Sequence, residues 1–572
     1  MRTAVLSAGL LLGACGPDQH EAPPATSLCE SGLTPITTVQ GTDFQSPLNG
    51  MEVTVLGTVT RLELGTGLYM ETRSGSGEAS RALYVHDPSM AAALTRGTQV
   101  AVRGTVGEAG TGTDTLTSLA DVTGYTTCAT DLPLPLSHVA LPMDAEQREA
   151  LEGMRVGFKQ GLAVTDVYHL AKGELTLSSD GVLQVPTEVR EPGTGAQELA
   201  RSNALRRIEV IAPSEPDAGV RVGAAAGPVV GIMGNDGRGQ KLLLEVMRTS
   251  QAEPPAPVPP HARDHLRIVS LNLLNFFNGD GLGGGFPTER GAKTPEEFEW
   301  RKQRLRAAVS TMQPDLLGVQ ELENDGFGPL SAAHSLLELL NEAWGGDWAA
   351  VMPGPGPIGG DVITVGLFYR SRVVEAVGAA AVLDGPEFEG LSRHPLAQVF
   401  RDRGGNTLLV AVNHLKSKGR CPQADPNADP NADQGDGQSC WNAARVAAVE
   451  AQLPRLESLA KAAGTDRLLV IGDMNSWRLE DPVRRFQDAG LADLVARLSK
   501  ALPYSYVFHG ERGTLDYAFA SPSVAESAAG ALIWHIDADW PAGRDLPQPW
   551  LRVSDHDPVV IDLDTSQSVT SD

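Results

Sequence analysis

The sequence is poor in basic residues, in aromatic residues and in cysteine, and long apolar runs are missing from it. Lysine and arginine number 46 against 71 aspartate and glutamate residues, which gives a formal net charge of −25. A surface this acidic excludes a protein that coats nucleic acid through a general positive field. It does not exclude an enzyme that holds a polyanion locally, or through a metal ion, and then releases its product.

The N-terminal residues, MRTAVLSAGLLLGAC, carry one basic residue and an apolar run that is too short to span a bilayer. The run is typical of an export signal peptide at 1–15, and its ending resembles a bacterial lipobox in which Cys15 is lipidated. A polar, Pro-rich tether at 16–28 follows. An ordinary signal peptide and a buried N-terminal segment are the alternatives. We expect an exported protein, either extracellular or held by acyl chains at the cell surface or outer membrane. The sequence implies no protein partner.

Cysteine is scarce beyond that position, and no Cys-x-x-Cys pair suggests zinc. An even number of cysteines in an exported protein suggests disulfides, and four cysteines allow three pairings. The economical pairing joins Cys29 to Cys128, which ties the ends of one domain together, and Cys421 to Cys440, which closes a short loop.

A Pro-rich linker at 251–264 separates two regions of different composition. Before it, short runs rich in Val and Thr alternate with Gly turns, which predicts a small antiparallel barrel at 29–130 and a second β-rich domain at 131–250. After it, strands alternate with helices, which predicts an α/β domain at 265–564, followed by a tail at 565–572.

Two helices of the α/β domain have ends that the sequence suggests. Thr294 can cap a helix that begins at Pro295, and Glu297 completes a capping box. The helix that begins near Trp441 is expected to be interrupted around Pro454, since proline removes a backbone donor.

Several strands of this domain end on polar residues that do not suit a core. A lone Asp after a strand is usually a turn former, and a lone His is usually structural. Interruptions at six strand edges of one domain are hard to explain in this way, and catalytic groups gather at strand ends in α/β folds. We therefore predict one shared site, built from Asn272, Glu321, His414, Asp473, Asn475, Asp516, Asp555 and His556.

Six blocks of the same region occur in the order expected of a known family. SLNLLNFF, GVQELEND, NHLKSKG, GDMNSW, TLDYAFAS and SDHDPV resemble the signature blocks of the endonuclease/exonuclease/phosphatase superfamily. The section from HLKSKG to CWNAAR is similar, more narrowly, to secreted bacterial extracellular nucleases of the ExeM/NucH type, and the N-terminal half resembles the OB-type region of those proteins. The resemblance implies a four-layer α/β sandwich like that of deoxyribonuclease I, preceded by a β-rich, OB-fold-like region.

The resemblance also implies a metal site. Glu321, assisted by Asn272, would hold Mg²⁺ or Mn²⁺, and Asp555 would bind a second metal. Few protein oxygens suit such a hard cation, because positions then remain for water and a phosphate.

Catalytic roles follow from the same resemblance. His556 would act as general base and Asp516 would orient it, while His414 would protonate the leaving oxygen or grip the phosphate. Asp473 would align the nucleophile, and Asn475 would hold a non-bridging phosphate oxygen.

The run HLKSKGR is a local exception to the acidic composition. Lys416 and Lys418 have no acid between them, and together with Arg445 they could hold the scissile and flanking phosphates. The alternative is a solvated turn. The resemblance also places Arg370, in VGLFYR, near the site.

The loop CPQADPNADPNADQGDGQSC carries acids and amides at alternating positions. Oxygen side chains in this pattern resemble calcium-binding loops, with Asp425, Asp429, Asp433 and Asp436 as candidate Ca²⁺ ligands. A disordered acidic insertion closed by a disulfide is the open alternative.

The leading hypothesis is a divalent-metal-dependent extracellular nuclease that hydrolyses phosphodiester bonds of DNA, with RNA as an open second substrate. Tyr69, Tyr84, Phe158 and Tyr168 are candidate base-stacking residues, although core positions are the simpler interpretation. Two rivals remain: a phosphomonoesterase or sphingomyelinase-type phosphodiesterase of the same fold, and a surface nucleic-acid-binding lipoprotein with an inactive enzyme domain.

Overall fold

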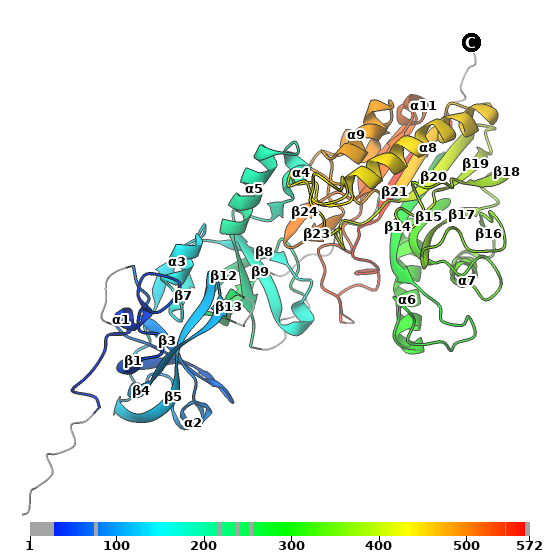
Figure 1. Ribbon diagram of the computed structural model, residues 1–572. Helices are drawn as coiled ribbons and strands as arrows, with labels where there is room; N and C mark the ends of the chain where they lie inside the picture. Colours follow the sequence, from blue (N-terminus) through cyan, green and yellow to red (C-terminus); the bar gives the residue numbers. More distant parts are fainter. Residues whose placement is uncertain are drawn as a thin grey trace, which may run out of the picture. The chain divides into compact units, whose positions relative to one another are not determined.

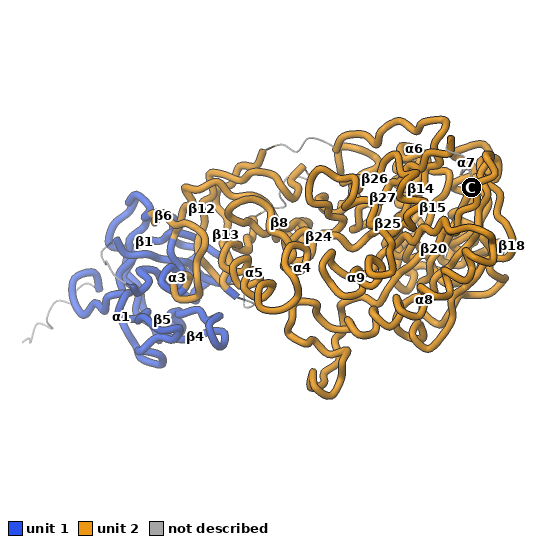
Figure 2. The backbone as a smooth tube through the Cα atoms, turned by 90° about the horizontal axis from the view of Figure 1, so that it is seen from above, with its two compact units in different colours: residues 1–135, 149–154, 237–239 blue, residues 136–148, 155–236, 240–572 orange. Residues whose placement is uncertain are grey.

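The computed structural model describes residues 28–73, 78–213, 219–235, 239–250, 255–543 and 545–566. Cys15, the expected signal peptide, nearly all of the expected tether and parts of the Pro-rich segment and tail lie outside the described residues. The fold is mixed α/β with a β-rich N-terminal region, as the sequence predicts (Figure 1). The chain divides into two compact units, residues 1–135 with 149–154 and 237–239, and residues 136–148 with 155–236 and 240–572 (Figure 2).

The first unit is a closed barrel of five strands, in the order β1 (Glu52–Glu63), β2 (Gly67–Glu71), β3 (Ala82–Val85), β5 (Asp114–Ala129) and β4 (Gln99–Thr111). Alternating apolar residues of these strands, such as Val53 and Val55, fill its interior. Two short helices, α1 (Ile36–Gln40) and α2 (Pro88–Ala93), lie beside the strands. The predicted disulfide between Cys29 and Cys128 is confirmed.

The second unit begins with a seven-stranded sheet. Its strands have the order β13 (Gln240–Thr249), β11 (Arg207–Ile211), β9 (Glu174–Ser179), β8 (Leu162–Asp166), β12 (Ala225–Asn235), β7 (Arg155–Phe158) and β6 (Ser137–Val139). The helical segments of this β-rich region are α3 (Ala145–Glu149), the 3₁₀ helix η1 (Leu170–Lys172), α4 (Pro186–Val189) and α5 (Thr194–Leu205).

This β-rich region and the α/β region that follows belong to one compact unit. The short strand β10 (Leu183–Gln184) pairs in parallel with β24 (Glu511–Gly513), which in turn pairs with β23 (Tyr506–Phe508). The buried carboxylate of Glu188 accepts a hydrogen bond from the backbone N–H of Thr514 at 3.0 Å. The Pro-rich segment therefore does not separate two compact units, in contrast to the expectation from its composition.

The α/β region is built on two six-stranded sheets. The first has the order β16 (Trp348–Ala350), β17 (Ile363–Arg370), β15 (Leu316–Glu323), β14 (His265–Phe276), β27 (Val559–Asp564) and β26 (Ala528–Ile533). The second has the order β18 (Val374–Val382), β19 (Leu396–Asp402), β20 (Thr407–His414), β21 (Leu468–Asp473), β25 (Asp516–Ala520) and β22 (Ala492–Asp493).

Three apolar clusters hold these sheets and their helices together. One contains side chains of the first sheet with those of α6 (Pro295–Met312) and α7 (Ala332–Trp344). Another combines side chains of both sheets, and a third joins the second sheet to α8 (Asn442–Ala462) and α9 (Asp481–Asp488). The short helices α10 (Leu494–Leu498) and α11 (Pro522–Glu526) complete the region.

The ends of α6 are as predicted, and the course of α8 is not. Thr294 Oγ1 accepts the N–H of Glu297 at 3.1 Å, and the Glu297 carboxylate accepts the N–H of Lys293 at 2.8 Å. The predicted interruption of α8 is wrong, since the helix continues through Pro454. Pro454 lies on the exposed face of α8. Buried residues close to it in sequence, including Leu456, keep the helix packed against the second sheet.

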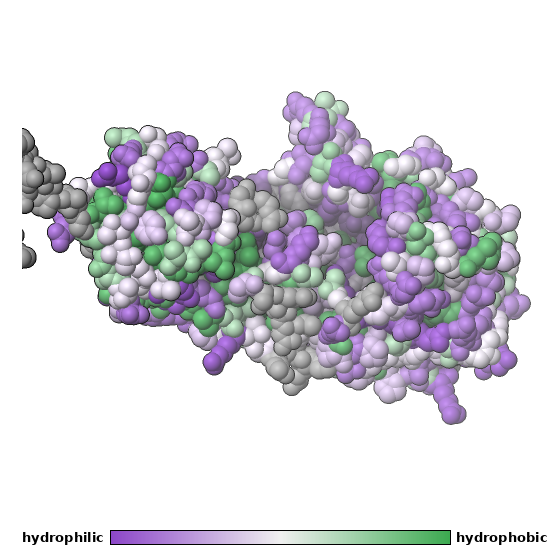
Figure 3. Space-filling view, turned by 90° about the horizontal axis from the view of Figure 1, so that it is seen from below, coloured by the Kyte–Doolittle hydropathy of each residue, from purple (hydrophilic) through white to green (hydrophobic). Residues whose placement is uncertain are grey.

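Hydrophilic side chains cover most of the face seen in Figure 3, with apolar residues scattered among them. Within the described ranges, none of the helices combines the length and the apolar character that crossing a membrane requires.

One acid of the barrel unit, Glu152, is buried with no basic side chain among its hydrogen-bond partners in the described part of the chain. Glu152 is 1% exposed, and its Oε1 atom accepts hydrogen bonds from Gln40 Nε2 at 3.1 Å and from the N–H of Thr117 at 3.0 Å. Burial, together with the nearby Glu149 and Glu108, raises the pKa of Glu152 to about 8. The folded unit therefore favours the protonated carboxyl.

We expect the barrel unit to lose stability as the pH rises from the ordinary carboxyl pKa of 4.5 to about 8. Over this window the unfolded chain has released the proton and the folded unit has kept it, so the free energy of unfolding falls with pH. Glu152→Gln keeps an acceptor oxygen and does not titrate, which removes this part of the decline. Calorimetric unfolding at about pH 5 and about pH 8.5 measures the effect, with the exposed Glu30→Gln as control. Equal declines in wild type and Glu152→Gln would contradict the assignment.

Candidate active site

Strand register brings the predicted residues to one edge of each sheet. His414 of β20 is paired with Asp473 of the parallel strand β21. On the other side of β21, the antiparallel strand β25 pairs Asp516 with Asp473. In the first sheet, Asn272 of β14 lies beside the end of β15 that carries Glu321. The polar strand ends that the sequence marks are therefore neighbours in space.

An aspartate–imidazole pair forms the centre of this site. His556 Nδ1 lies 2.8 Å from Asp516 Oδ2, and Ser505 Oγ donates to the same oxygen at 2.7 Å. Burial acts to lower the pKa of His556, but Asp516 and Asp473 outweigh it and raise this pKa well above its ordinary value. The hydrogen bond at Nδ1 fixes the ring and leaves Nε2 on its other side.

Asp473 lies between two imidazoles. Its Oδ2 atom is 3.5 Å from His414 Nε2 and 4.0 Å from His556 Nε2. Burial raises the pKa of Asp473 to about 7. Burial, with the neighbouring Arg393, lowers the pKa of His414 well below its ordinary value. A neutral His414 favours the role of gripping a phosphate by a hydrogen bond over that of an acid.

The sequence GDMN turns the end of β21 toward the site. Gly472 has a φ of +129°, and a Cβ atom there would lie 2.1 Å from the carbonyl oxygen of Asn413, so only glycine fits. The N–H of Asn475 donates to Asp473 Oδ1 at 2.8 Å, and its side-chain Nδ2 donates to Asp473 Oδ2 at 3.1 Å. Asn475 has a φ of 46°, which is strained for a residue with a side chain. These contacts hold the predicted carboxylate and carboxamide together.

Glu321 is half-buried, and one of its carboxylate oxygens is buried with an unmet hydrogen-bonding requirement. Its Oε1 atom accepts from Asn272 Nδ2 at 3.3 Å, whereas its Oε2 atom has no hydrogen-bond partner. Burial, followed by the neighbouring Asp555, raises the pKa of Glu321. The residue also has a φ of 60°, in the left-handed region. A divalent cation fits this arrangement, since carboxylate and amide oxygens are the ligands that Mg²⁺ and Mn²⁺ prefer.

A second group of possible metal donors lies beside it. Asp473, Asp516 and His556 each place one ligand atom within 4.8 Å of the others, and the described residues contain no further group of this kind. The carboxylate of Asp516 and the ring of His556 are already hydrogen bonded to each other. The unpartnered oxygen of Glu321 is therefore the better candidate for a metal ligand.

Most of the predicted residues line one cleft of about 900 Å³, and Asn272 and Asp516 lie behind them as hydrogen-bond partners of Glu321 and His556. The residues of the predicted site that line it are Glu321, His414, Asp473, Asn475, Asp555 and His556. Part of the opposite wall comes from the β-rich region, at Pro186 of α4 and Gln197 of α5. Glu321 and His556 thus share a cleft, as a common site requires.

Two arginines and a tyrosine of the cleft have no signal in the sequence. Arg393 Nη1 lies 3.4 Å from His414 Nε2, and Arg290 lines the same cleft. Both guanidinium groups lie near Asp361, at 3.3 Å and 3.8 Å. The ring of Tyr506 packs at 4.6 Å, between centroids, against the imidazole of the central pair. None of the three belongs to a matched block; Arg290 and Arg393 lie on loops and Tyr506 begins β23, so tertiary packing brings them here.

The predicted phosphate-binding lysines are already engaged by the protein. Lys418 lines the cleft, but its Nζ atom donates to Glu480 Oε2 at 2.5 Å and to the carbonyl of Gln438 at 2.7 Å. Lys416 Nζ lies over the ring of Trp441, 4.8 Å from its centroid. Of the two lysines, therefore, only Lys418 lines the cleft, and its ammonium group is already paired with Glu480.

Arg445 is a structural residue, and its prediction as a phosphate ligand is wrong. Its side chain is fully buried and donates to the carbonyl oxygens of Lys416, Cys440 and Gln438 at 3.1–3.3 Å. The guanidinium therefore ties together the backbone around the loop that the Cys421–Cys440 disulfide closes, a pairing that the structure confirms.

Arg370 is also wrong as a site residue. In the antiparallel register of β15 and β17, Leu316 is paired with Tyr369 and Leu322 with Thr364. Arg370 therefore lies at the end of the sheet opposite to Glu321. It forms an ion pair with Asp347 at 3.1 Å.

The acids of the 421–440 loop do not gather around a common point. Each of the four candidate calcium ligands accepts the backbone N–H two residues further on, at 2.8–2.9 Å; they are Asp425, Asp429, Asp433 and Asp436. This is the pattern of Asx turns. Turn formation thus accounts for the alternating acids, and calcium binding by this loop stays a prediction.

Three of the four candidate stacking residues are core residues. Tyr69, Tyr84 and Phe158 are 2%, 6% and 5% exposed, which confirms the simpler interpretation. Tyr168 differs from them, because it is 62% exposed.

Comparisons with known proteins concern this same region. Residues 269–556, half of the chain, match the Endonuclease/Exonuclease/phosphatase family. Among curated proteins no significant match was found.

Several solved structures are similar to the chain. An endonuclease/exonuclease/phosphatase family protein from Bacteroides thetaiotaomicron is 19% identical, with 52% of this chain and 97% of that chain covered and a TM-score of 0.37. The human Nocturnin catalytic domain with a bound sulfate anion is 19% identical, with 54% and 98% covered and a TM-score of 0.34. TDP2 of D. rerio, solved with a single-strand DNA product, is 15% identical, with 52% and 98% covered and a TM-score of 0.34.

We expect Glu321→Gln to weaken Mn²⁺ binding by at least about 10-fold, because the change removes the charge of the candidate ligand and keeps its shape. Calorimetric titration of the full chain with Mn²⁺ measures this directly, without any substrate. Glu299→Gln on the exposed face of α6 is the matched control. Unchanged Mn²⁺ affinity in Glu321→Gln would show that the ion, if one binds, is held elsewhere.

We expect Arg445→Ala to act on stability. The change removes the side-chain donor of the Lys416 and Cys440 carbonyl groups, at a cost of about 1–3 kcal/mol for each, and leaves the Gln438 carbonyl with Lys418 as its remaining side-chain donor. Chemical denaturation of the variant and of the exposed Arg420→Ala measures the difference. A variant of wild-type stability with weakened phosphate binding would restore the original prediction for Arg445.

Proposed function

The chain belongs to the endonuclease/exonuclease/phosphatase family, and on this premise we propose that it is a divalent-metal-dependent nuclease. Its proposed substrate is DNA, with RNA as a second substrate, and its proposed relatives are the bacterial extracellular nucleases of the ExeM/NucH type. The observation that carries the proposal is the shared cleft, which is lined both by His556, held by Asp516, and by Glu321, whose carboxylate has a buried, unpartnered oxygen. A water-derived nucleophile and a phosphate need these two features on the same side of the molecule.

In the proposed reaction, the chain's own groups carry the proton and orient the phosphodiester. Asp516 raises the pKa of His556 and so makes its ring a stronger base; in the neutral ring, Nδ1–H donates to Asp516 and Nε2 is left to accept a proton from the attacking water. Asp473, whose carboxylate is 4.0 Å from that Nε2 atom, aligns the same water. Neutral His414 and the nearby Arg393 donate to the non-bridging oxygens.

Glu321, Asn272 and Asp555 are the residues that would hold the catalytic cation. When bound, a divalent cation supplies charge that polarises a phosphoryl oxygen and stabilises the leaving oxygen. Asn475, which is tied to Asp473, lines the cleft and is placed to contact another phosphate oxygen.

We also propose the finer fold assignments. A four-layer, deoxyribonuclease-I-like sandwich is supported by the three apolar clusters, two of which join a sheet to its own helices and one of which joins the sheets. An OB-fold is supported for the barrel by its strand order, β1-β2-β3-β5-β4.

Export with a lipid anchor at Cys15 remains a proposal of the same kind. The lipobox sequence supports it, and so do the two disulfides, since such bonds persist mainly in oxidising compartments outside the cytosol.

The proposed activity is tested with plasmid DNA, RNA, sphingomyelin and inositol phosphates, each with and without a chelator. We expect chelator-sensitive cleavage of the plasmid, reduced by at least about 100-fold in Glu321→Ala and His556→Ala, which lose the metal ligand and the base. Glu338→Ala and His334→Ala, an exposed pair on α7, are the matched controls.

The outcomes separate the rival functions. Turnover of sphingomyelin or inositol phosphates without plasmid cleavage would contradict the nuclease and support a phosphatase or lipid phosphodiesterase. Binding of DNA without cleavage of any substrate would indicate an inactive enzyme domain. Cleavage that survives in both Glu321→Ala and His556→Ala would show that the site is misassigned.

A further inference from the structure

A second cavity, of about 530 Å³, adjoins the catalytic cleft. Asn275, Arg290 and Asp555 line both spaces, so the two are continuous. The volume is in the range of small-molecule sites. The Glu321, His414 and Asp473 side chains do not line this second cavity, and nothing in the proposed reaction uses it.

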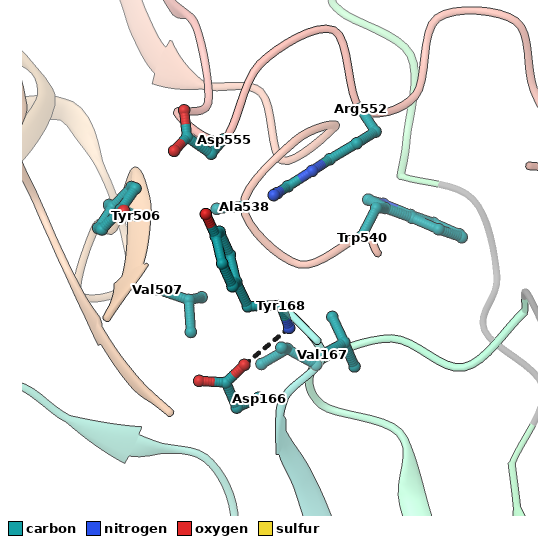
Figure 4. A pocket seen from close by; sticks show the side chains of 10 residues that line it. Asp166, Val167, Tyr168, Tyr506, Val507, Ala538, Trp540, Arg552 and Asp555 are labelled. Carbon is teal, nitrogen blue, oxygen red and sulfur yellow. Dashed lines mark hydrogen bonds between the residues drawn. The ribbon is translucent and has the colours of Figure 1, made fainter. Parts of the chain in front are cut away.

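One wall of this cavity comes from the β-rich region. Tyr168, His169 and Lys172, on the connection between β8 and β9, face α6 and the segment around Arg552. Figure 4 shows the ring of Tyr168 in a smaller, neighbouring pocket, between Tyr506 on one side and Arg552 on the other. A residue outside the family match thus contributes an aromatic face next to the catalytic cleft.

The exposure of Tyr168 does not come from a loosely held loop. Tyr168 is 62% exposed, whereas Val167 and Leu170 on either side of it are each 3% exposed. The N–H of Tyr168 donates to Asp166 Oδ1 at 2.7 Å, as Figure 4 also shows. The protein therefore fixes the backbone and leaves the ring of this tyrosine open to the cavity.

The charge of the lining is opposite to that of the chain as a whole. Five cationic side chains line the cavity against two carboxylates, Glu297 and Asp555; the cations are Lys172, Arg290, Arg301, Arg304 and Arg552. The chain carries a formal net charge of −25, so this local excess of cations is a departure from its general composition. An exposed aromatic ring beside cations is what a nucleotide, with its flat base and its phosphate, requires.

We propose that this cavity is a subsite for the nucleotide that flanks the scissile phosphate, and that it binds single-stranded substrate in preference to small phosphodiesters. The base stacks on Tyr168, and the phosphate faces Lys172 and Arg290. The inference rests on the proposed nuclease function. It adds that the enzyme binds the nucleotide next to the scissile phosphate as well as that phosphate. Stacking is tolerant of base identity, so the subsite contributes affinity without sequence preference.

The test compares two substrates of one enzyme. A short single-stranded DNA oligonucleotide fills both the cleft and the subsite, whereas bis(4-nitrophenyl) phosphate offers a phosphodiester without a flanking nucleotide. In Tyr168→Ala the ratio of kcat/KM for the oligonucleotide to kcat/KM for the aryl diester should fall about 5- to 100-fold, the range expected for the loss of one base–aromatic stack. The lower ratio should result from a higher KM for the oligonucleotide.

Matched variants keep the outcome specific. Tyr168→Trp retains an aromatic face and should restore most of the ratio, while Lys172→Ala should lower it and reduce its dependence on salt. Lys461→Ala, an exposed lysine at the end of α8, should leave the ratio as in wild type.

An unchanged ratio in Tyr168→Ala, in an enzyme that cleaves the oligonucleotide, would overturn the subsite and leave the nuclease function standing. A wild-type enzyme that hydrolyses the aryl diester and not the oligonucleotide would overturn both. Equal losses in Tyr168→Ala and Tyr168→Trp would also overturn the subsite, because stacking would then not be the cause.

Discussion

The account depends on four carboxylates where two sheets end, two of them buried and two half-buried. Removing a carboxylate from water without a partner costs on the order of several kcal/mol, so each must be compensated. Asp516 is compensated by His556, and Asp473 lies between two imidazole rings. Glu321, beside Asp555, keeps one oxygen without a partner. This imbalance is what a bound cation would correct, and it lies in the same cleft as the imidazole that would act as base.

Much of this site could be predicted from the sequence, because its residues share a local property: each is a polar residue at or near the end of a buried strand. Glu321 and Asp473 are examples, and strand register then makes such positions neighbours. Arg393 could not be predicted, since a loop carries it to His414 and only tertiary packing decides the path of a loop. Arg370 was placed near the site by the resemblance alone, and the antiparallel register of β15 and β17 puts it at the other end of the sheet.

The remaining differences from the structure concern charged residues whose hydrogen-bond partners are backbone groups. Arg445 was predicted to hold a phosphate, yet its guanidinium donates to three backbone carbonyl groups. The acids of the 421–440 loop have the spacing of metal ligands, yet each closes its own turn. The disulfides Cys29–Cys128 and Cys421–Cys440 were predicted correctly, because four cysteines allow only three pairings.

The central claim is that the two halves of the site act together around one cation. The most direct measurement is a crystal structure of the protein soaked with Mn²⁺, with the ion located by its anomalous scattering. The account predicts one strong peak in the catalytic cleft, in contact with the carboxylate of Glu321 and on the side that faces His556. A cleft without a peak while Mn²⁺ binds elsewhere on the chain would contradict it.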